Sequence, residues 1–136
     1  MDLNRMTLKL QEALQAASAH AMRRSHQGID IEHLLLALME QETGLTGPLF
    51  EQAGVSPAAV QKAAEATLDR TPQVQGPGAA PGQVHVTQRL SHVLTQAEQE
   101  MRGLHDEYVS VEHVLLAMVV EGGILKQLGL TRDRLL

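Results

Sequence analysis

Cysteine is absent from the sequence, which excludes disulfide bonds, a thiolate nucleophile and zinc sites ligated by cysteine. Aromatic residues are almost absent as well, since Phe50 and Tyr108 are the only two in 136 residues. The core must therefore be aliphatic, and alanine and leucine supply most of it. Because these side chains suit helices better than β-sheets, the composition predicts packed helices. The length is sufficient for one domain.

Concentrated positive charge is also missing. The net charge is -5, and no cluster of lysine or arginine exceeds the pair Arg23 and Arg24. A nucleic-acid partner is not expected, because phosphate binding needs a concentrated basic face. The amino terminus lacks the apolar region of a secretory signal, and no apolar run approaches membrane-spanning length. We therefore expect no membrane partner and a cytoplasmic location, with which the lack of cysteine is compatible.

Catalytic signatures are missing too. The sequence contains no GxxxxGK[ST] phosphate loop, no HExxH motif and no Ser–His–Asp pattern. We therefore predict that the chain is not an enzyme, and that it has no catalytic residues and no cofactor of its own. Seven histidines leave a metal-binding helical protein as an alternative. Their spacing fits no closed zinc pattern, so no metal ligands are predicted.

One phrase occurs twice, as IDIEHLLLAL at 29–38 and as VSVEHVLLAM at 109–118. A shift of eighty residues matches 6–41 with 86–121 without a gap, and the register then changes by five, so that 47–60 matches 122–135. The identical pairs are Thr7/Thr87, Leu10/Leu90, Leu14/Leu94, Ala17/Ala97, Glu32/Glu112, His33/His113, Leu35/Leu115, Leu36/Leu116 and Ala37/Ala117, and the similar pairs are Lys9/Arg89, Ile29/Val109, Ile31/Val111 and Leu38/Met118. This collinear match indicates a duplication, and two long copies predict a pseudo-twofold domain.

Each copy is predicted to form about four helices, which makes the fold class all-α. Apolar residues recur every three or four positions from Leu3 to Ala21 and indicate one amphipathic helix. Asp30 is the expected N-cap of a second, buried helix. A short third helix is expected to begin at Gly47-Pro48, and a fourth extends from Ser56-Pro57 to about Arg70.

The predicted organisation is a single domain, 1–136. The first copy occupies 1–70, and the second occupies 85–136. Between them, 71–84 reads as a linker, because its first thirteen residues contain three prolines and three glycines. Thr131 is the expected N-cap of a last helix, which the end of the sequence at Leu136 leaves truncated.

The repeated Glu-His pair has two interpretations. In the first, Asp30 and Ser110 cap the two central helices, so that Glu32 and Glu112 occupy the second helical position. A carboxylate there is favoured by the positive end of the helix and by its unpaired N–H groups, by roughly 0.3–1 kcal/mol. This interpretation is purely structural, and a different polar residue would serve nearly as well.

In the second interpretation, the repeated Thr and Glu residues line a small acidic depression where two helix starts meet. The residues are Thr7, Glu32, Thr87 and Glu112, with Ile31 and Val111 as an apolar lip. Such a depression favours cationic groups beside apolar contacts, which suits an extended polypeptide. This interpretation also explains why Thr7 and Thr87 recur, which the first interpretation does not. Asp106 and Tyr108 precede the second phrase, so the second site is expected to be the more acidic, more aromatic and more active one.

Several segments together resemble the N-terminal domain of Clp ATPases, and in particular that of the bacterial ClpB disaggregases. These segments are DLNRMTLKLQEALQAA, IDIEHLLLAL, YVSVEHVLLAM, PLFEQAGVSPAAV and TPQVQG. The resemblance extends over essentially the whole chain. It implies an all-helical domain of two four-helix repeats, tethered flexibly to ATP-driven rings outside this chain.

The resemblance also implies a function, namely that the domain engages misfolded or aggregated polypeptides before a hexamer threads them. ATP and Mg²⁺ then belong to the ring domains, a co-chaperone system to the parent protein, and the chain alone is expected to be a monomer. Thr7, Asp106 and Glu112 fall on ClpB positions implicated in chaperone function. Two pairs, Glu32 with Glu112 and Thr7 with Thr87, resemble the phosphoarginine pockets of ClpC-type domains. Docking of an adaptor or a phosphoarginine degron is therefore the alternative function.

Overall fold

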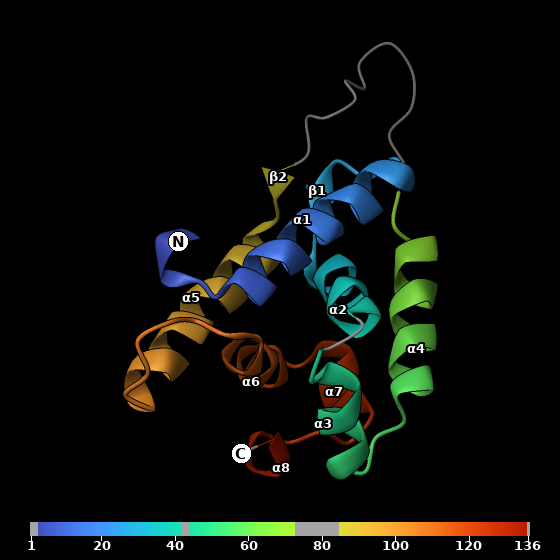
Figure 1. Ribbon diagram of the computed structural model, residues 1–136. Helices are drawn as coiled ribbons and strands as arrows, with labels where there is room; N and C mark the ends of the chain where they lie inside the picture. Colours follow the sequence, from blue (N-terminus) through green and yellow to red (C-terminus); the bar gives the residue numbers. More distant parts are fainter. Residues whose placement is uncertain (1–2, 42–43, 73–84, 136) are drawn as a thin grey trace.

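The computed structural model describes residues 3–41, 44–72 and 85–135. It confirms the all-α class and the two copies of four helices (Figure 1). A short 3-10 helix, Leu3–Arg5, precedes the first copy. The first copy consists of α1 (Leu8–Arg23), α2 (Ile31–Glu40), α3 (Thr46–Gln52) and α4 (Pro57–Asp69), and the second of α5 (Gln88–Gly103), α6 (Val111–Glu121), α7 (Gly123–Gln127) and α8 (Arg132–Leu135).

Several helices begin after a residue whose side chain satisfies one of the first free N–H groups. Asp30 and Ser56 cap α2 and α4, as predicted, and the Thr131 hydroxyl accepts from the Arg134 N–H at the start of α8. The prediction that the first long helix includes Leu3 was wrong. That helix begins after Thr7, whose hydroxyl accepts the Leu10 N–H at 3.3 Å and makes it a cap.

Two short parallel ladders, which the sequence did not predict, join the copies. Strand β1 (Gly28–Ile29) pairs with β2 (His85–Val86), and Met6 forms a bridge with Val109. The eighty-residue shift converts one ladder into the other. Gly28 leaves room for this approach, because a Cβ there would lie 2.7 Å from a side-chain carbon of Thr87. The start of each long helix is thereby fixed beside the central helix of the other copy.

The central helices α2 and α6 lie in the interior. Their repeated apolar phrases are buried over residues 31–38 and 113–119. Helix α2 contacts α1, α4 and α5, while α6 contacts α5, α7 and α8. The buried apolar residues of both copies form one continuous cluster. Near the C-terminal end, α8 packs against α3 of the first copy, so the copies interlock at both ends (Figure 1).

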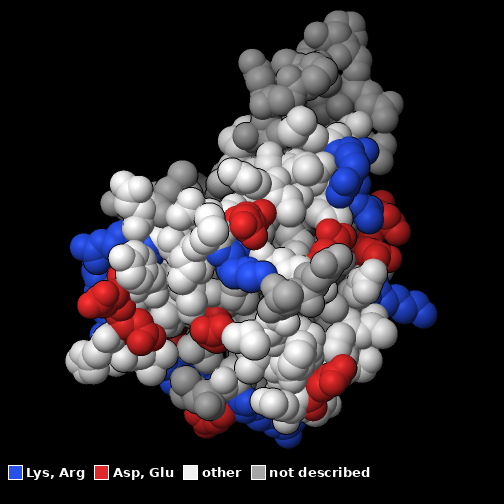
Figure 2. All heavy atoms as spheres, viewed as in Figure 1, with Lys and Arg blue, Asp and Glu red and all other residues white. Residues whose placement is uncertain are grey.

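The linker and the distribution of surface charge were also predicted from the sequence. Most of the predicted linker, 73–84, lies outside the described residues. On the face shown in Figure 2, lysine and arginine side chains are interspersed with acidic ones over a largely uncharged surface. Within the described ranges, none of the helices combines the length and the apolar character needed to cross a bilayer.

Candidate functional site

The repeated Thr and Glu residues do come together, but each pair joins the two copies. Thr87 of the second copy lies beside Asp30 and Glu32 of the first, at what we call the first site. Thr7 of the first copy lines a groove with Glu112 of the second, which we call the second groove. The parallel ladders cause this crossing, since each one holds the start of a long helix against the partner copy's central helix.

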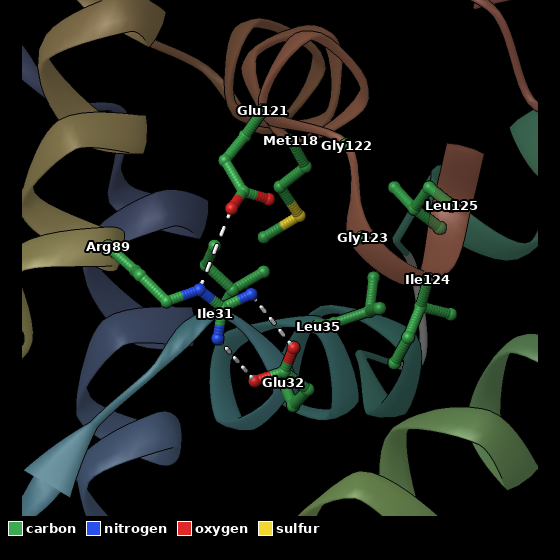
Figure 3. Close-up of a pocket in the computed structure, with 10 residues that line it drawn as sticks. All are labelled: Ile31, Glu32, Leu35, Arg89, Met118, Glu121, Gly122, Gly123, Ile124 and Leu125. Carbon is green, nitrogen blue, oxygen red and sulfur yellow. Dashed lines mark hydrogen bonds and ion pairs between the residues drawn. The ribbon is translucent and has the colours of Figure 1, made fainter. Parts of the chain in front are cut away.

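The first site is organised around the guanidinium of Arg89, which extends from α5 between α2 and α6 (Figure 3). One of its nitrogens contacts Asp30 at 3.0 Å, and two donate to the Glu32 carboxylate at 3.4 Å. Its Nε lies 3.6 Å from Glu121. The Thr87 hydroxyl completes the network by donating to Asp30 at 3.0 Å. Three carboxylates therefore share one cation that belongs to the chain itself.

This arrangement leaves almost no room at the first site. Glu32 is only 4% exposed, and a buried carboxylate is stable only when it is paired and hydrogen-bonded. Burial alone would lower the pKa of Arg89, but Glu32 and Asp30 outweigh it, so the pKa is raised and the cation persists. The cavity that remains is about 10 Å³, which holds at most about one water molecule.

Helix α7 also covers the first site. It begins at Gly123, directly after Gly122 ends α6, and it places Ile124 and Leu125 in the wall of the cavity (Figure 3). In the first copy, α3 begins only at Thr46 although α2 has ended at Glu40. This difference is the register change of five that the sequence repeat contains.

The second groove is open, with a volume of about 440 Å³. Its walls come from the starts of α1 and α6 and from Gln41, Gly44 and Leu45, which lie between α2 and α3. The lining residues are Thr7, Lys9, Gln41, Gly44, Leu45, Ser110, Val111 and Glu112. Leu45 is 56% exposed, which is unusual for a large apolar side chain beside a cavity. Apolar surface and one accessible carboxylate thus lie next to each other.

Glu112 is held differently from its counterpart Glu32. Its carboxylate is exposed and accepts a hydrogen bond at 3.0 Å from the hydroxyl of Ser110, which stands where the first copy has Asp30. The hydrogen bond orients the carboxylate without neutralising it. A carboxylate that is fixed in direction and still charged can bind an N–H donor or a cation from outside.

The histidines of the Glu-His pairs complete the capping of α2 and α6. Nδ1 of His33 accepts the Asp30 N–H at 2.8 Å, and Nδ1 of His113 accepts the Ser110 N–H at 2.9 Å. The outer nitrogen differs between the copies. His113 pairs with Asp106 at 2.7 Å, whereas His33 contacts His26 at 2.8 Å.

The predicted site residues therefore separate into three groups. Thr7, Val111 and Glu112 line the second groove, and Ile31, Glu32 and Thr87 lie at the first site. Asp106 and Tyr108 are about half exposed but line neither cavity. Asp106 instead orients His113. The threonines, whose recurrence was left unexplained by capping, are themselves the caps of α1 and α5.

Sequence reasoning missed the residues that make the two sites unequal. Arg89 and Glu121 close the first site, and Lys9, Gln41 and Leu45 line the second groove. Through the eighty-residue shift, Lys9 corresponds to Arg89 and Gln41 to Glu121. The first of these pairs was visible as a similar pair, but its importance depends on contacts between distant segments.

Replacing Thr87 with alanine is expected to lower the free energy of unfolding by about 1 kcal/mol. The hydroxyl accepts the Leu90 N–H at 3.2 Å while it donates to Asp30, so its loss removes a cap and one link between the copies. Urea denaturation measures the effect. Thr87→Ser retains the hydroxyl and should stay near the wild type. Equal stability of the alanine and serine variants would contradict a capping role.

The alternative of a metal-binding protein finds no donor set in the described ranges. No group of three or more His, Asp or Glu side chains there is arranged to hold a metal ion.

Comparison with known sequences gives a match to one family model and to full-length relatives. The family model of the Clp repeat (R) N-terminal domain matches residues 5–129. Chaperone protein ClpB of Bacillus cereus is 43% identical over 140 residues, which cover 100% of this chain and 16% of that protein. Chaperone protein ClpB of Nitratidesulfovibrio vulgaris is 43% identical over 142 residues, with the same shares. The chain thus spans about 16% of these relatives' length.

Solved structures share the fold. The N-domain of ClpV from Vibrio cholerae has a TM-score of 0.81 at 19% identity, over 97% of this chain and 81% of that one. The Hsp104 N-terminal domain from Candida albicans has a TM-score of 0.77 at 20% identity, over 96% and 85%. A complex of a ClpV N-domain with a VipB peptide has a TM-score of 0.79 at 21% identity, over 97% and 82%.

Proposed function

Because the chain belongs to the Clp repeat N-terminal domain family, as its sequence resemblance indicated, we propose that it recruits unfolded or aggregated polypeptide for a longer chaperone. ATP hydrolysis, hexamerisation and cooperation with co-chaperones are assigned to that parent protein. The proposal adds a location for recruitment, which is the second groove. The supporting observation is that this groove is open beside an exposed carboxylate, while its counterpart is filled.

The chemistry of the second groove suits an extended polypeptide segment. Leu45 and Val111 offer apolar contact, and the Glu112 carboxylate offers a strong acceptor for backbone N–H groups or cationic side chains. Small-molecule sites, by contrast, usually enclose most of their ligand. A shallow groove with few fixed contacts gives weak binding, which lets a recruiting module release its client.

A solved domain of the same fold supports binding of peptides by this architecture, since a ClpV N-domain was captured with a VipB peptide. The sequence identity of 21% limits this support to the fold.

The experiment that tests the proposal is an NMR titration of the ¹⁵N-labelled domain with a short unstructured peptide rich in leucine and arginine. We expect amide shifts at Thr7, Leu45 and Val111. Glu112→Gln should weaken binding about 1.4- to fivefold, the range for one exposed ion pair. Glu51→Gln removes the same charge from the exposed face of α3 and should leave the affinity unchanged.

Two outcomes would remove the proposal. One is the absence of shifts around the second groove at millimolar peptide. The other is an equal loss of affinity in Glu51→Gln and Glu112→Gln, because that result would indicate general charge attraction without a site. A peptide whose leucines are replaced by serine should bind more weakly, since it lacks the apolar contacts with Leu45 and Val111.

A second candidate function, docking of a phosphoarginine degron or an adaptor, is favoured by one observation. The second groove carries Lys9 and Glu112 on the same lining surface, and these opposite charges complement a phosphate and a guanidinium. Free phosphoarginine should then displace the peptide at micromolar concentration. Indifference of the peptide complex to phosphoarginine would remove this second candidate and leave recruitment of unfolded polypeptide.

A further inference from the structure

We infer that Arg89 is an intramolecular ligand that keeps the first site permanently occupied and leaves the second groove as the one of the two duplicated sites that is open to a client. The inference rests on the proposed function, and it names the residue that makes two duplicated sites unequal. Arg89 acts here as a specificity-determining residue, because its side chain fills the place that a client side chain takes in the second groove.

The contacts of Arg89 are those of a bound ligand. Its guanidinium enters from α5, meets the carboxylates of Asp30 and Glu32 on α2, and reaches Glu121 at the end of α6 (Figure 3). These elements come from different copies, so the guanidinium occupies the junction between them. The Gly123 backbone closes the far side, since a Cβ there would lie 3.9 Å from an Arg89 nitrogen.

Three substitutions between the copies account for the difference. The first site has Arg89, Glu121 and Asp30, and the second groove has Lys9, Gln41 and Ser110 at the corresponding positions. The planar guanidinium of arginine can bind several carboxylates at once, which the ammonium of lysine does less well. Two of the three acids that hold Arg89 in place are absent from the second groove. Glu112 there is exposed, whereas Glu32 is buried.

Burial keeps the intramolecular ligand bound. Because Glu32 is buried, release of Arg89 would leave a charged carboxylate without its partner in a region of low polarity. The second groove carries no such desolvation penalty, since the Glu112 carboxylate faces solvent. At the first site an external client therefore has to displace a tethered cation from a buried carboxylate, whereas at the second groove it meets an exposed one.

The test uses Arg89→Ala, which should open a cavity of the size of one arginine side chain below α7. Ethylguanidinium chloride at millimolar concentration should then raise the melting temperature of the variant by several degrees. Sodium chloride at the same ionic strength should raise it less, and the wild type should not respond. This readout reports occupancy of the first site without any client.

The same variant tests the specificity. The leucine- and arginine-rich peptide should shift the amides of Ile31, Leu35 and Thr87 in Arg89→Ala but not in the wild type. Adding Glu112→Gln should weaken binding at the second groove by the same factor as in the wild type and leave the shifts at the first site unchanged. If Arg89→Ala does not fold, Arg89→Lys combined with Glu121→Gln and Asp30→Ser reproduces the residues of the second groove, and both readouts apply to it.

A folded variant with neither ethylguanidinium stabilisation nor peptide shifts at the first site would overturn the inference. Equal peptide shifts at both sites in the wild type would overturn it as well. Absence of peptide binding at the second groove of the wild type is a different result, because it removes the proposed function while the ethylguanidinium readout still decides the role of Arg89.

Discussion

Replacing Leu115 with alanine is expected to lower the free energy of unfolding by about 2–5 kcal/mol. Leu115 lies in α6 and is 0% exposed, so the substitution removes buried contacts and leaves a cavity. Its apolar neighbours belong to a cluster that continues into the first copy. We therefore expect both copies to be destabilised together, in a single unfolding transition, although only the second copy is altered.

Urea denaturation and amide hydrogen exchange measure the two parts of this prediction. Exchange should accelerate in α2 as well as in α6. Leu8→Ala is the matched control, because Leu8 is 69% exposed on α1 and its loss should change stability by about 0.5 kcal/mol or less. Separate transitions for the two copies, or faster exchange confined to residues 85–135, would show that the copies fold independently.

The helices and most of their starts could be predicted from the sequence, because these depend on local interactions. Apolar spacing located the long helices, and the caps at Asp30, Ser56 and Thr131 follow from side chains that reach N–H groups one to three residues away. The all-buried character of α2 and α6 followed from their continuous apolar runs. The internal repeat then predicted the second half from the first.

The relation between the copies could not be predicted in the same way. A repeat indicates that two segments have the same structure, but it does not say which segment of one copy lies beside which segment of the other. The ladders that place Thr87 next to Asp30, and Thr7 beside Glu112, consist of a few backbone hydrogen bonds without a sequence signature. For this reason the sequence indicated which residues form the candidate sites, but not which threonine lies beside which glutamate.

The inequality of the sites depends on differences that look small in the sequence. Lysine and arginine align as similar residues, yet Arg89 binds buried Glu32, and Lys9 lines an open groove. The change of register by five residues looks like an alignment gap, yet it brings α7 over the first site. Burial and contact distance give these differences their effect, and neither is visible before the chain is folded.

Acidification is expected to destabilise the first copy through His33, and His26→Asp is expected to reduce this sensitivity. The His33 ring is 1% exposed, and burial together with His26 lowers its pKa from 6.5 to about 4. Asp30 opposes this shift, and His20 and Arg24 add to it. The lowered pKa corresponds to roughly 3 kcal/mol between the neutral and the charged ring.

The hydrogen bonds explain why the pair resists a proton. Nδ1 of His33 accepts the Asp30 N–H, so its Nε2 carries the hydrogen that is donated to Nδ1 of His26. The hydrogen of His26 then lies on Nε2, which is buried without a well-formed partner in the described part of the chain. Burial and Arg24 also lower the pKa of His26. In both rings the Nδ1 lone pair already accepts a hydrogen bond. Adding a proton to either ring therefore breaks that hydrogen bond.

The surrounding charges do not supply a partner for a protonated His33. His20 pairs with Glu40 at 3.0 Å, and Arg24 pairs with Asp69 at 3.0 Å. In the second copy, Asp106 occupies the position of His26 and presents a carboxylate to His113 at 2.7 Å. His26→Asp therefore transplants the arrangement of the second copy into the first.

The sign of the pH dependence follows from the direction of the shift. Because the pKa of His33 is lower in the folded chain, the unfolded chain binds more protons between pH 6.5 and about 4. The contribution of His33 is fully present above pH 6.5 and is lost as the pH falls towards 4. Urea denaturation across this range should show the loss in the wild type and a smaller one in His26→Asp.

NMR titration of the imidazole nitrogens separates this effect from the protonation of carboxylates. His33 should titrate near pH 4 in the wild type and at higher pH in His26→Asp, where a carboxylate stabilises the charged ring. Asp106→His is the reciprocal variant and should increase the acid sensitivity of the domain. A wild-type His33 that titrates near 6.5 would contradict the neutral pair, because burial would then impose no penalty on its charge. Equal pH slopes for the wild type and His26→Asp would place the acid sensitivity in other groups, since only position 26 differs between the two chains.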